Sequence, residues 1–321
     1  MRRTALIALL LGVAALVTTV VYAGIGGVEQ AVLRLGVAGL LLVALIHLPV
    51  IALTGAAWWL IGAELPGASV WKFIWARYVR EATAEVLPFS QLGGIVAGAR
   101  ALSLAGLESL PVAATLLKDL LLEQLAKVPY VLAGLAVLLL GGRDAPLRLV
   151  AAALAPLGLL ALAAFLGRAR LAGLFTRFAA ALARRRPALG VAANASLEPL
   201  WRWDRRAGAA LATHAVTWVL GAGETWVVCR LMGLAVSPAQ ALVIDSLFSG
   251  LRTVGFAVPA ALGIQEAGYV LVCALVGVPP APAVALSLIR RVREMLLGVP
   301  ALGIWQAVEG GRALAGLSES K

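Results

Sequence analysis

The sequence predicts an all-α, polytopic helical membrane protein whose two halves are related as an inverted-topology repeat. Of its 321 residues, 62% are hydrophobic and only 13% are charged, and the mean hydropathy is +0.96. A soluble domain carries about twice that share of charged residues. Only helices and closed barrels satisfy every backbone group in lipid, and long Leu, Ala and Val runs without alternation indicate helices.

An internal repeat divides this single transmembrane domain (1–321) into halves of about 1–142 and 143–321. Residues 87–107 and 258–277 share a proline, a Leu-Gly pair and an Ala-Gly pair in the same order. Farther on, 117–129 matches 288–300 in its leucines, its glutamate and its final Val-Pro. Paired Gly- and Pro-interrupted segments in two halves are typical of transporter binding sites. We therefore expect a broken or re-entrant helical hairpin in each half, unless Ala/Leu/Gly-rich sequence aligns with itself by chance.

A bilayer crossing needs about 20 apolar residues, and six segments meet this requirement without interruption. The first is read as an uncleaved span, because its apolar run is long for a signal peptide and ends in a poor cleavage site. The expected spans are 4–24, 35–61, 119–141, 149–167, 208–230 and 283–308. Two further apolar regions, 72–107 and 240–280, are interrupted by Pro, Gly and charge.

The arginines set the expected topology. A loop at 168–206 is rich in arginine, and Arg2 and Arg3 precede the first span. The positive-inside rule places both in the cytoplasm. Counting the spans then places both termini in the cytoplasm and starts the two interrupted regions at opposite faces, as an inverted repeat requires. An amphipathic piece of the loop, 171–186, reads as an interfacial anchor or as a surface for anionic headgroups.

Charged residues inside the apolar spans are functional candidates, because each costs about 2.5–3.5 kcal/mol at a helix centre. We expect them to face partners or water, with Arg290 and Arg293 approaching Asp119 and Glu123 and with Arg290 paired to Glu294. The alternatives are an ion-pair network that locks the helices together and a polar cavity. This intramembrane charge network comprises Lys118, Asp119, Glu123, Arg290, Arg291, Arg293 and Glu294.

A second group of polar residues lies in the interrupted regions and is the expected path of a substrate. Glycines there allow tight turns or close backbone approach, so that the hairpin tips could meet. The expected hairpin glycines are Gly93, Gly94, Gly98, Gly263 and Gly268. The expected path residues are Arg77, Arg80, Glu81, Glu85 and Gln91 from the first region, and Arg252, Gln265 and Glu266 from the second.

The remaining polar residues of the spans have simpler interpretations, as core or interface residues. Glu224, His47 and His214 are isolated, and for each histidine a core or interface role is favoured over a proton relay. Cys229 and Cys273 fit no metal spacing and are expected to be small core hydrophobes. There is no Walker A loop, metal-ligand cluster or Gly-x-Ser-x-Gly in the sequence, so we expect no enzyme activity, no cofactor and no metal. The net charge of +11 reflects membrane topology, and no nucleic-acid partner is expected.

Three segments carry a family resemblance. ARYVREATAEVLPFSQLGGIVAGARAL (76–102), GETWVVCRLMG (223–233) and VPAALGIQEAGYVLV (258–272) resemble the flippase-like family that contains the membrane part of lysylphosphatidylglycerol synthase. Within it they look most like the hopanoid-biosynthesis-associated membrane proteins. The resemblance implies a multi-pass protein of the bacterial inner membrane that moves a polar-headgroup lipid or a hopanoid between leaflets. The sequence ends at Lys321 without a soluble aminoacyl-transfer domain, so lysyl transfer is not expected.

Two classes of function follow from these observations. The first is a lipid flippase or transporter whose partners are membrane lipids with anionic headgroups, or hopanoids. The second is a non-transporting scaffold or regulator of a lipid-synthesis complex, acting as a homo-oligomer or with synthesis partners. Polar residues that converge on the membrane midplane favour the first class, whereas a dry and fully paired ion network favours the second.

Overall fold

The computed structural model describes residues 24–86, 90–141, 203–254 and 264–319, together with Thr18 and Val21. The secondary structure of these parts is helical, which confirms the all-α prediction for them. The helices are α2 (Ile25–Gly62), α3 (Val70–Val86), α4 (Ser90–Leu104), α5 (Ser109–Leu140), α8 (Arg205–Leu231), α9 (Pro238–Val254), α10 (Ile264–Leu275) and α11 (Pro280–Glu319). Nearly all of the expected span 4–24, the span 149–167, the piece 171–186 and most of the Arg-rich loop lie outside the described residues.

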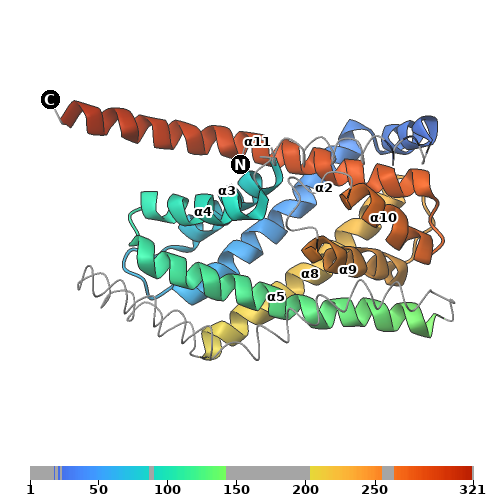
Figure 1. Cartoon of the computed structure of the whole chain (residues 1–321), viewed down its shortest axis with the longest axis horizontal. Helices are drawn as coiled ribbons and strands as arrows, with labels where there is room; N and C mark the ends of the chain where they lie inside the picture. Colours follow the sequence, from blue (N-terminus) through green and yellow to red (C-terminus); the bar gives the residue numbers. More distant parts are fainter. Residues whose placement is uncertain are drawn as a thin grey trace.

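The order long, short, short, long occurs twice along the chain (Figure 1). The long helices α2, α5, α8 and α11 contain 38, 32, 27 and 40 residues, more than the roughly 20 that cross a bilayer. They contain the remaining four expected spans. By length and composition, α2 and α5 are apolar enough to cross a membrane, whereas α8 and α11 carry more charge.

Each interrupted region forms two short helices. Helices α3 and α4 have 17 and 15 residues, and α9 and α10 have 17 and 12. Helix α3 packs against α4, and α9 packs against α10. All four helices fall short of a full bilayer crossing. The breaks, at 87–89 and 255–263, lie outside the described residues.

The helix contacts correspond when the two halves are exchanged, that is, when α2, α3, α4 and α5 are replaced by α8, α9, α10 and α11 and the reverse. Helix α3 packs against α11 as α5 packs against α9, and α2 packs against α11 as α8 packs against α5. The contact of α4 with α5 likewise corresponds to that of α10 with α11. Figure 1 shows that α5 and α11 run in opposite directions, and that α2 and α8 do so as well.

Small residues permit the close packing of α3 on α4. A Cβ atom added at Gly94 would lie 2.5 Å from the carbonyl oxygen of Arg80, and one at Gly98 would lie 2.9 Å from the Arg80 Cβ. The expected close approach is therefore confirmed at these two glycines. It is absent at Gly93, where the nearest atom would be 3.8 Å away, while at Gly268 the ring of Phe248 would lie at 3.3 Å. Gly263 lies outside the described residues.

The main hydrophobic core lies among α2, α5, α8, α9, α10 and α11, and it contains both cysteines. Cys229 and Cys273 are buried free thiols, as expected. Many large apolar side chains point outward instead, including Val37 at 75% exposure and Leu140 at 87%. An apolar surface over long helices suits a lipid environment.

Candidate functional site

The interior of the bundle contains many charged side chains, and most are arranged in ion pairs. Burial of single charges in a membrane is costly, and pairing reduces the cost. The charges and their hydrogen-bond partners form four groups: the first cluster (Arg77, Arg80, Glu81, Asp119, Glu123 and His214), the second cluster (Tyr130, Thr225, Asp245 and Arg290), the hairpin contacts (Glu85, Arg252, Glu266 and Arg291) and a chain of His47, Glu224, Arg293 and Glu294.

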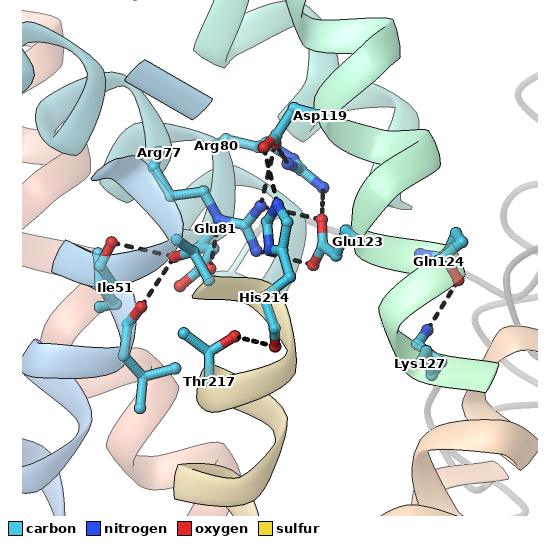
Figure 2. A network of polar contacts seen from close by, with 12 residues as sticks. Ile51, Arg77, Arg80, Glu81, Asp119, Glu123, Gln124, Lys127, His214 and Thr217 are labelled. Carbon is cyan, nitrogen blue, oxygen red and sulfur yellow. Dashed lines mark hydrogen bonds and ion pairs between the residues drawn. The ribbon is translucent and has the colours of Figure 1, made fainter. Parts of the chain in front are cut away.

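The first cluster joins α3, α5 and α8 (Figure 2). Arg77 donates to Glu123 through both terminal nitrogens, at 3.0 and 2.9 Å, and through Nε to Glu81 at 2.7 Å. Two parallel bonds between a guanidinium and a carboxylate form the strongest kind of ion pair. Arg80 reaches Glu123 at 3.1 Å and Asp119 at 3.4 Å. The arginines of α3 are thus held by the carboxylates of α5.

A histidine completes the first cluster from α8. The Nε2 atom of His214 lies 2.9 Å from Oδ1 of Asp119, and neither side chain has any exposed surface. The other ring nitrogen of His214, Nδ1, is buried and has no hydrogen-bond partner among the described residues. This is an unusual state for a buried polar atom.

The second cluster joins α5, α8, α9 and α11. Asp245 accepts hydrogen bonds from Tyr130 at 2.7 Å and Thr225 at 2.8 Å, and it pairs with Arg290. The Arg290 guanidinium lies 5.7 Å from the ring centre of Tyr269.

A chain of ionisable groups also links α2, α8 and α11. Glu224 pairs with Arg293 on one side and lies 2.8 Å from Nδ1 of His47 on the other. Arg293 also contacts Glu294 at 3.3 Å.

One of the hairpin contacts connects the two interrupted regions, and the other joins α10 to α11. Glu85, in the last turn of α3, pairs with Arg252, near the end of α9. On α10, Glu266 pairs with Arg291 at 2.9 Å, and Gln265 donates to the carbonyl of Ser287 at 3.4 Å. The ends of α3 and α9 therefore meet, whereas the breaks that would form the hairpin tips lie outside the described residues.

The expected residues come together, but with different partners. The expectation that Arg290 and Arg293 would approach Asp119 and Glu123 is wrong, because α3 supplies the arginines for these two carboxylates. The expected pairing of Arg290 with Glu294 is also wrong, since Asp245 and Arg293 are their respective partners. Lys118 is buried on α5. The side chain of Gln91 is not among those that the structure describes.

Several residues of these groups were not among the expected site residues: His47, Tyr130, His214, Glu224, Thr225 and Asp245. Their partners lie far away in the sequence, 177 residues for His47 and Glu224. For one of them the structure, and not the sequence repeat, shows a counterpart in the other half. Asp245 and Arg77 each occupy the eighth position of their helices, α9 and α3.

The two halves thus carry opposite charges at corresponding places. In the first half, Arg77 of α3 faces carboxylates of α5, whereas in the second half Asp245 of α9 faces Arg290 of α11. Asp119 and Arg290 themselves correspond in the sequence repeat, each two residues after a matched leucine. Within the described helices, no group of three or more His, Cys, Asp or Glu side chains is placed to hold a metal ion. The chemistry of the site is that of paired charges.

A comparison with protein families identifies the chain. The sequence model of the lysylphosphatidylglycerol synthase transmembrane region matches residues 5–301. The chain therefore belongs to this membrane-domain family. Comparisons with curated proteins and with solved structures give no match.

Proposed function

From its membership of the lysylphosphatidylglycerol synthase transmembrane family, we propose that this chain is a lipid flippase or transporter. It moves a polar-headgroup lipid or a hopanoid between the leaflets of the bacterial inner membrane, and it catalyses no chemical reaction. Both termini face the cytoplasm. Within the family it belongs to the branch associated with hopanoid biosynthesis, as the segments 76–102, 223–233 and 258–272 suggest.

The proposal includes an inverted repeat, which several contacts support. The pair Arg206–Glu64, at 2.9 Å, brings the start of α8 to the end of α2. The pair Arg100–Glu309, at 3.1 Å, brings α4 beside the C-terminal part of α11. In Figure 1 these ends lie on the side from which α3 and α4 enter, while α9 and α10 enter from the other side. Broken helices entering from opposite faces are typical of transporters with inverted repeats.

The observation that carries the proposal is the Glu85–Arg252 pair between the two hairpins. A lipid that crosses the bilayer needs a polar path for its headgroup while its tails remain in the hydrocarbon. Arg252 retains 32% side-chain exposure and Glu85 retains 22%, so this pair is less enclosed than Arg77, Arg80, Asp119, Glu123 and His214 of the first cluster. An anionic headgroup competes with Glu85 for the guanidinium, because phosphate and carboxylate bind arginine with the same geometry.

A specific observation also favours the second function, a non-transporting scaffold in a lipid-synthesis complex or homo-oligomer. The charges of the first cluster are extensively paired, and all of them except Glu81 are largely buried, as expected for a lock between helices.

Reconstitution distinguishes the two functions. Purified protein is inserted into vesicles that carry fluorescent phosphatidylglycerol, phosphatidylcholine or a labelled hopanoid in one leaflet, and the label reaching the other leaflet is measured over time. A flippase accelerates the transfer of at least one of these lipids by tenfold or more over protein-free vesicles. A scaffold leaves all three rates equal to those of protein-free vesicles, and that result refutes the transport proposal.

A further inference from the structure

His214 differs in one respect from the other ionisable groups of the first cluster, because half of its hydrogen-bonding capacity is unused. It lies on α8, wholly buried, with Nε2 on Asp119 and Nδ1 without a partner in the described part of the chain. The chain contains only two histidines. The other, His47, binds Glu224 through Nδ1.

The contacts define where a proton can be added to this ring. Asp119 takes its place between Arg80 and His214 as an ionised carboxylate, which only accepts hydrogen bonds. The nitrogen that faces it, Nε2, must therefore carry hydrogen. In the neutral ring the lone pair then lies on Nδ1, the atom without a partner. A proton bound there converts the ring to imidazolium without disturbing the bond to Asp119.

Charged groups of two other helices make up the rest of the cluster around the ring. Helix α3 contributes Arg77, Arg80 and Glu81, and α5 contributes Asp119 and Glu123 (Figure 2). These are two guanidiniums and three carboxylates, and Lys127 of α5 also interacts electrostatically with Glu123.

The other charged and polar groups of the neighbouring helices have contacts of their own. On α5, Lys127 donates to Gln124 at 2.9 Å and lies 5.0 Å from the ring centre of Trp218, and Lys118 is buried beside Asp119. On α8, Thr217 donates to the carbonyl of His214, and Glu224 pairs with Arg293 of α11 and with His47 of α2. Asp245 of α9 and Arg290 of α11 pair with each other.

The same cluster holds the hairpin that reaches the lipid path. Asp119 and Glu123 bind α3 through Arg77 and Arg80, and the last turn of α3 carries Glu85, the partner of Arg252. The positive charge of an imidazolium beside Asp119 repels the guanidinium of Arg80, which lies on the other oxygen of the same carboxylate. Protonation therefore weakens the hold of α5 on α3 and frees the hairpin to move.

We propose that His214 and Asp119 form a proton-binding site, and that a proton taken up at Nδ1 of His214 drives the movement of lipid. The proton enters from water on one side of the membrane, bonds to the Nδ1 lone pair, and leaves to the opposite side after the hairpin has moved. No other bond forms or breaks. The coupling rests on the proposed transport function, whereas proton binding itself does not.

Proton binding is measured without lipid transport. The chain is labelled with ¹⁵N-histidine and placed in lipid nanodiscs, and its ring nitrogens are followed by NMR between about pH 5 and pH 8, the interval in which histidine charge switches operate. The ring missing from the His214→Gln spectrum is that of His214. We expect an Nε2–H neutral ring at high pH and a doubly protonated ring at low pH, with an altered midpoint in Asp119→Asn. A His214 ring that stays in one state throughout overturns the proposal, and the wild-type titration alone suffices if the variants do not fold.

Coupling is measured in vesicles with a difference of one pH unit across the membrane. For one proton per lipid, the ratio of labelled lipid between leaflets shifts by up to about tenfold, since one pH unit and a tenfold ratio are the same free energy. The shift persists in Thr213→Ala, whose hydroxyl bonds only within its own helix, and disappears in His214→Gln. Wild-type protein that moves lipid without responding to the gradient overturns the coupling and leaves the transport function standing. Protein that moves no lipid overturns both, while the NMR titration still decides the proton site.

Discussion

At the residue scale, the structure explains how charges can be present in a membrane interior. Arg77 makes two bonds to Glu123 and one to Glu81, so that its guanidinium is surrounded by acceptors. A network of this kind is sensitive to the loss of any member, because the remaining partners stay buried with an unbalanced charge. The arginine geometry also matters, since lysine cannot bind a carboxylate through two parallel bonds.

Glu123→Gln tests this sensitivity. The change removes one carboxylate from two buried guanidiniums, and we expect a loss of about 3–5 kcal/mol in the free energy of unfolding, measured by denaturant titration in detergent. Glu64→Gln is the matched control, because Glu64 pairs with Arg206 at the surface with 83% exposure. Exposed pairs contribute about 0.2–1 kcal/mol. Equal losses in the two variants would show that the interior pairs do not stabilise the fold.

At the element scale, the short helices depend on small residues at their contacts. The backbone of α3 lies so close to α4 that only glycine fits at Gly94. One position earlier, a Cβ atom at Gly93 would meet only Thr83, at the ordinary contact distance of 3.8 Å. The two adjacent glycines therefore have different roles in the same hairpin.

Alanine substitutions at this pair of glycines are expected to differ in effect. Gly94→Ala places a methyl group 2.5 Å from a backbone oxygen of Arg80, which forces α3 and α4 apart and lowers the melting temperature. Gly93→Ala meets only ordinary van der Waals contact, and alanine favours the helix by up to about 1 kcal/mol, so its melting temperature stays the same or rises. Thermal unfolding of both variants in detergent decides between them. A tolerated Gly94→Ala would contradict the close packing of this hairpin.

At the scale of the whole molecule, an inverted repeat requires two sets of described helices, α2 to α5 and α8 to α11, to have opposite orientations in the membrane. The loop before α3 contains Glu64, and the loop before α9 contains Ala235; both residues are exposed. An inverted repeat places these corresponding loops on opposite faces. A parallel repeat would place them on the same face.

Single cysteines report on this orientation, because the native Cys229 and Cys273 are buried. We expect Glu64→Cys to react with an impermeant maleimide from the cytoplasmic face and Ala235→Cys to react from the other face. The unmodified chain, which retains its two native cysteines, serves as the unreactive control. Labelling of both positions from one face would rule out the inverted repeat.

The sequence predicted the elements of this fold better than the partners of its charges. Apolar runs located the four described long helices, and the repeated Pro and Gly residues located the broken regions, since both signals are local. The partners of Asp119 and Arg290 were assigned wrongly, because charge sign alone does not show which helix lies between two others. His214 and Glu224 were read as isolated for the same reason: each meets its partner through packing of helices distant in sequence.

The most direct test of the central claim compares two arginines that each form one ion pair between helices. Arg252 pairs with Glu85 where the hairpins meet, whereas Arg100 pairs with Glu309 at the surface with 54% exposure. In vesicles with label in one leaflet, we predict that Arg252→Gln reduces the rate of lipid transfer at least tenfold, while Arg100→Gln retains the wild-type rate and both variants melt at the wild-type temperature. Folded Arg252→Gln protein that transfers lipid as fast as Arg100→Gln would contradict a lipid path between the hairpins.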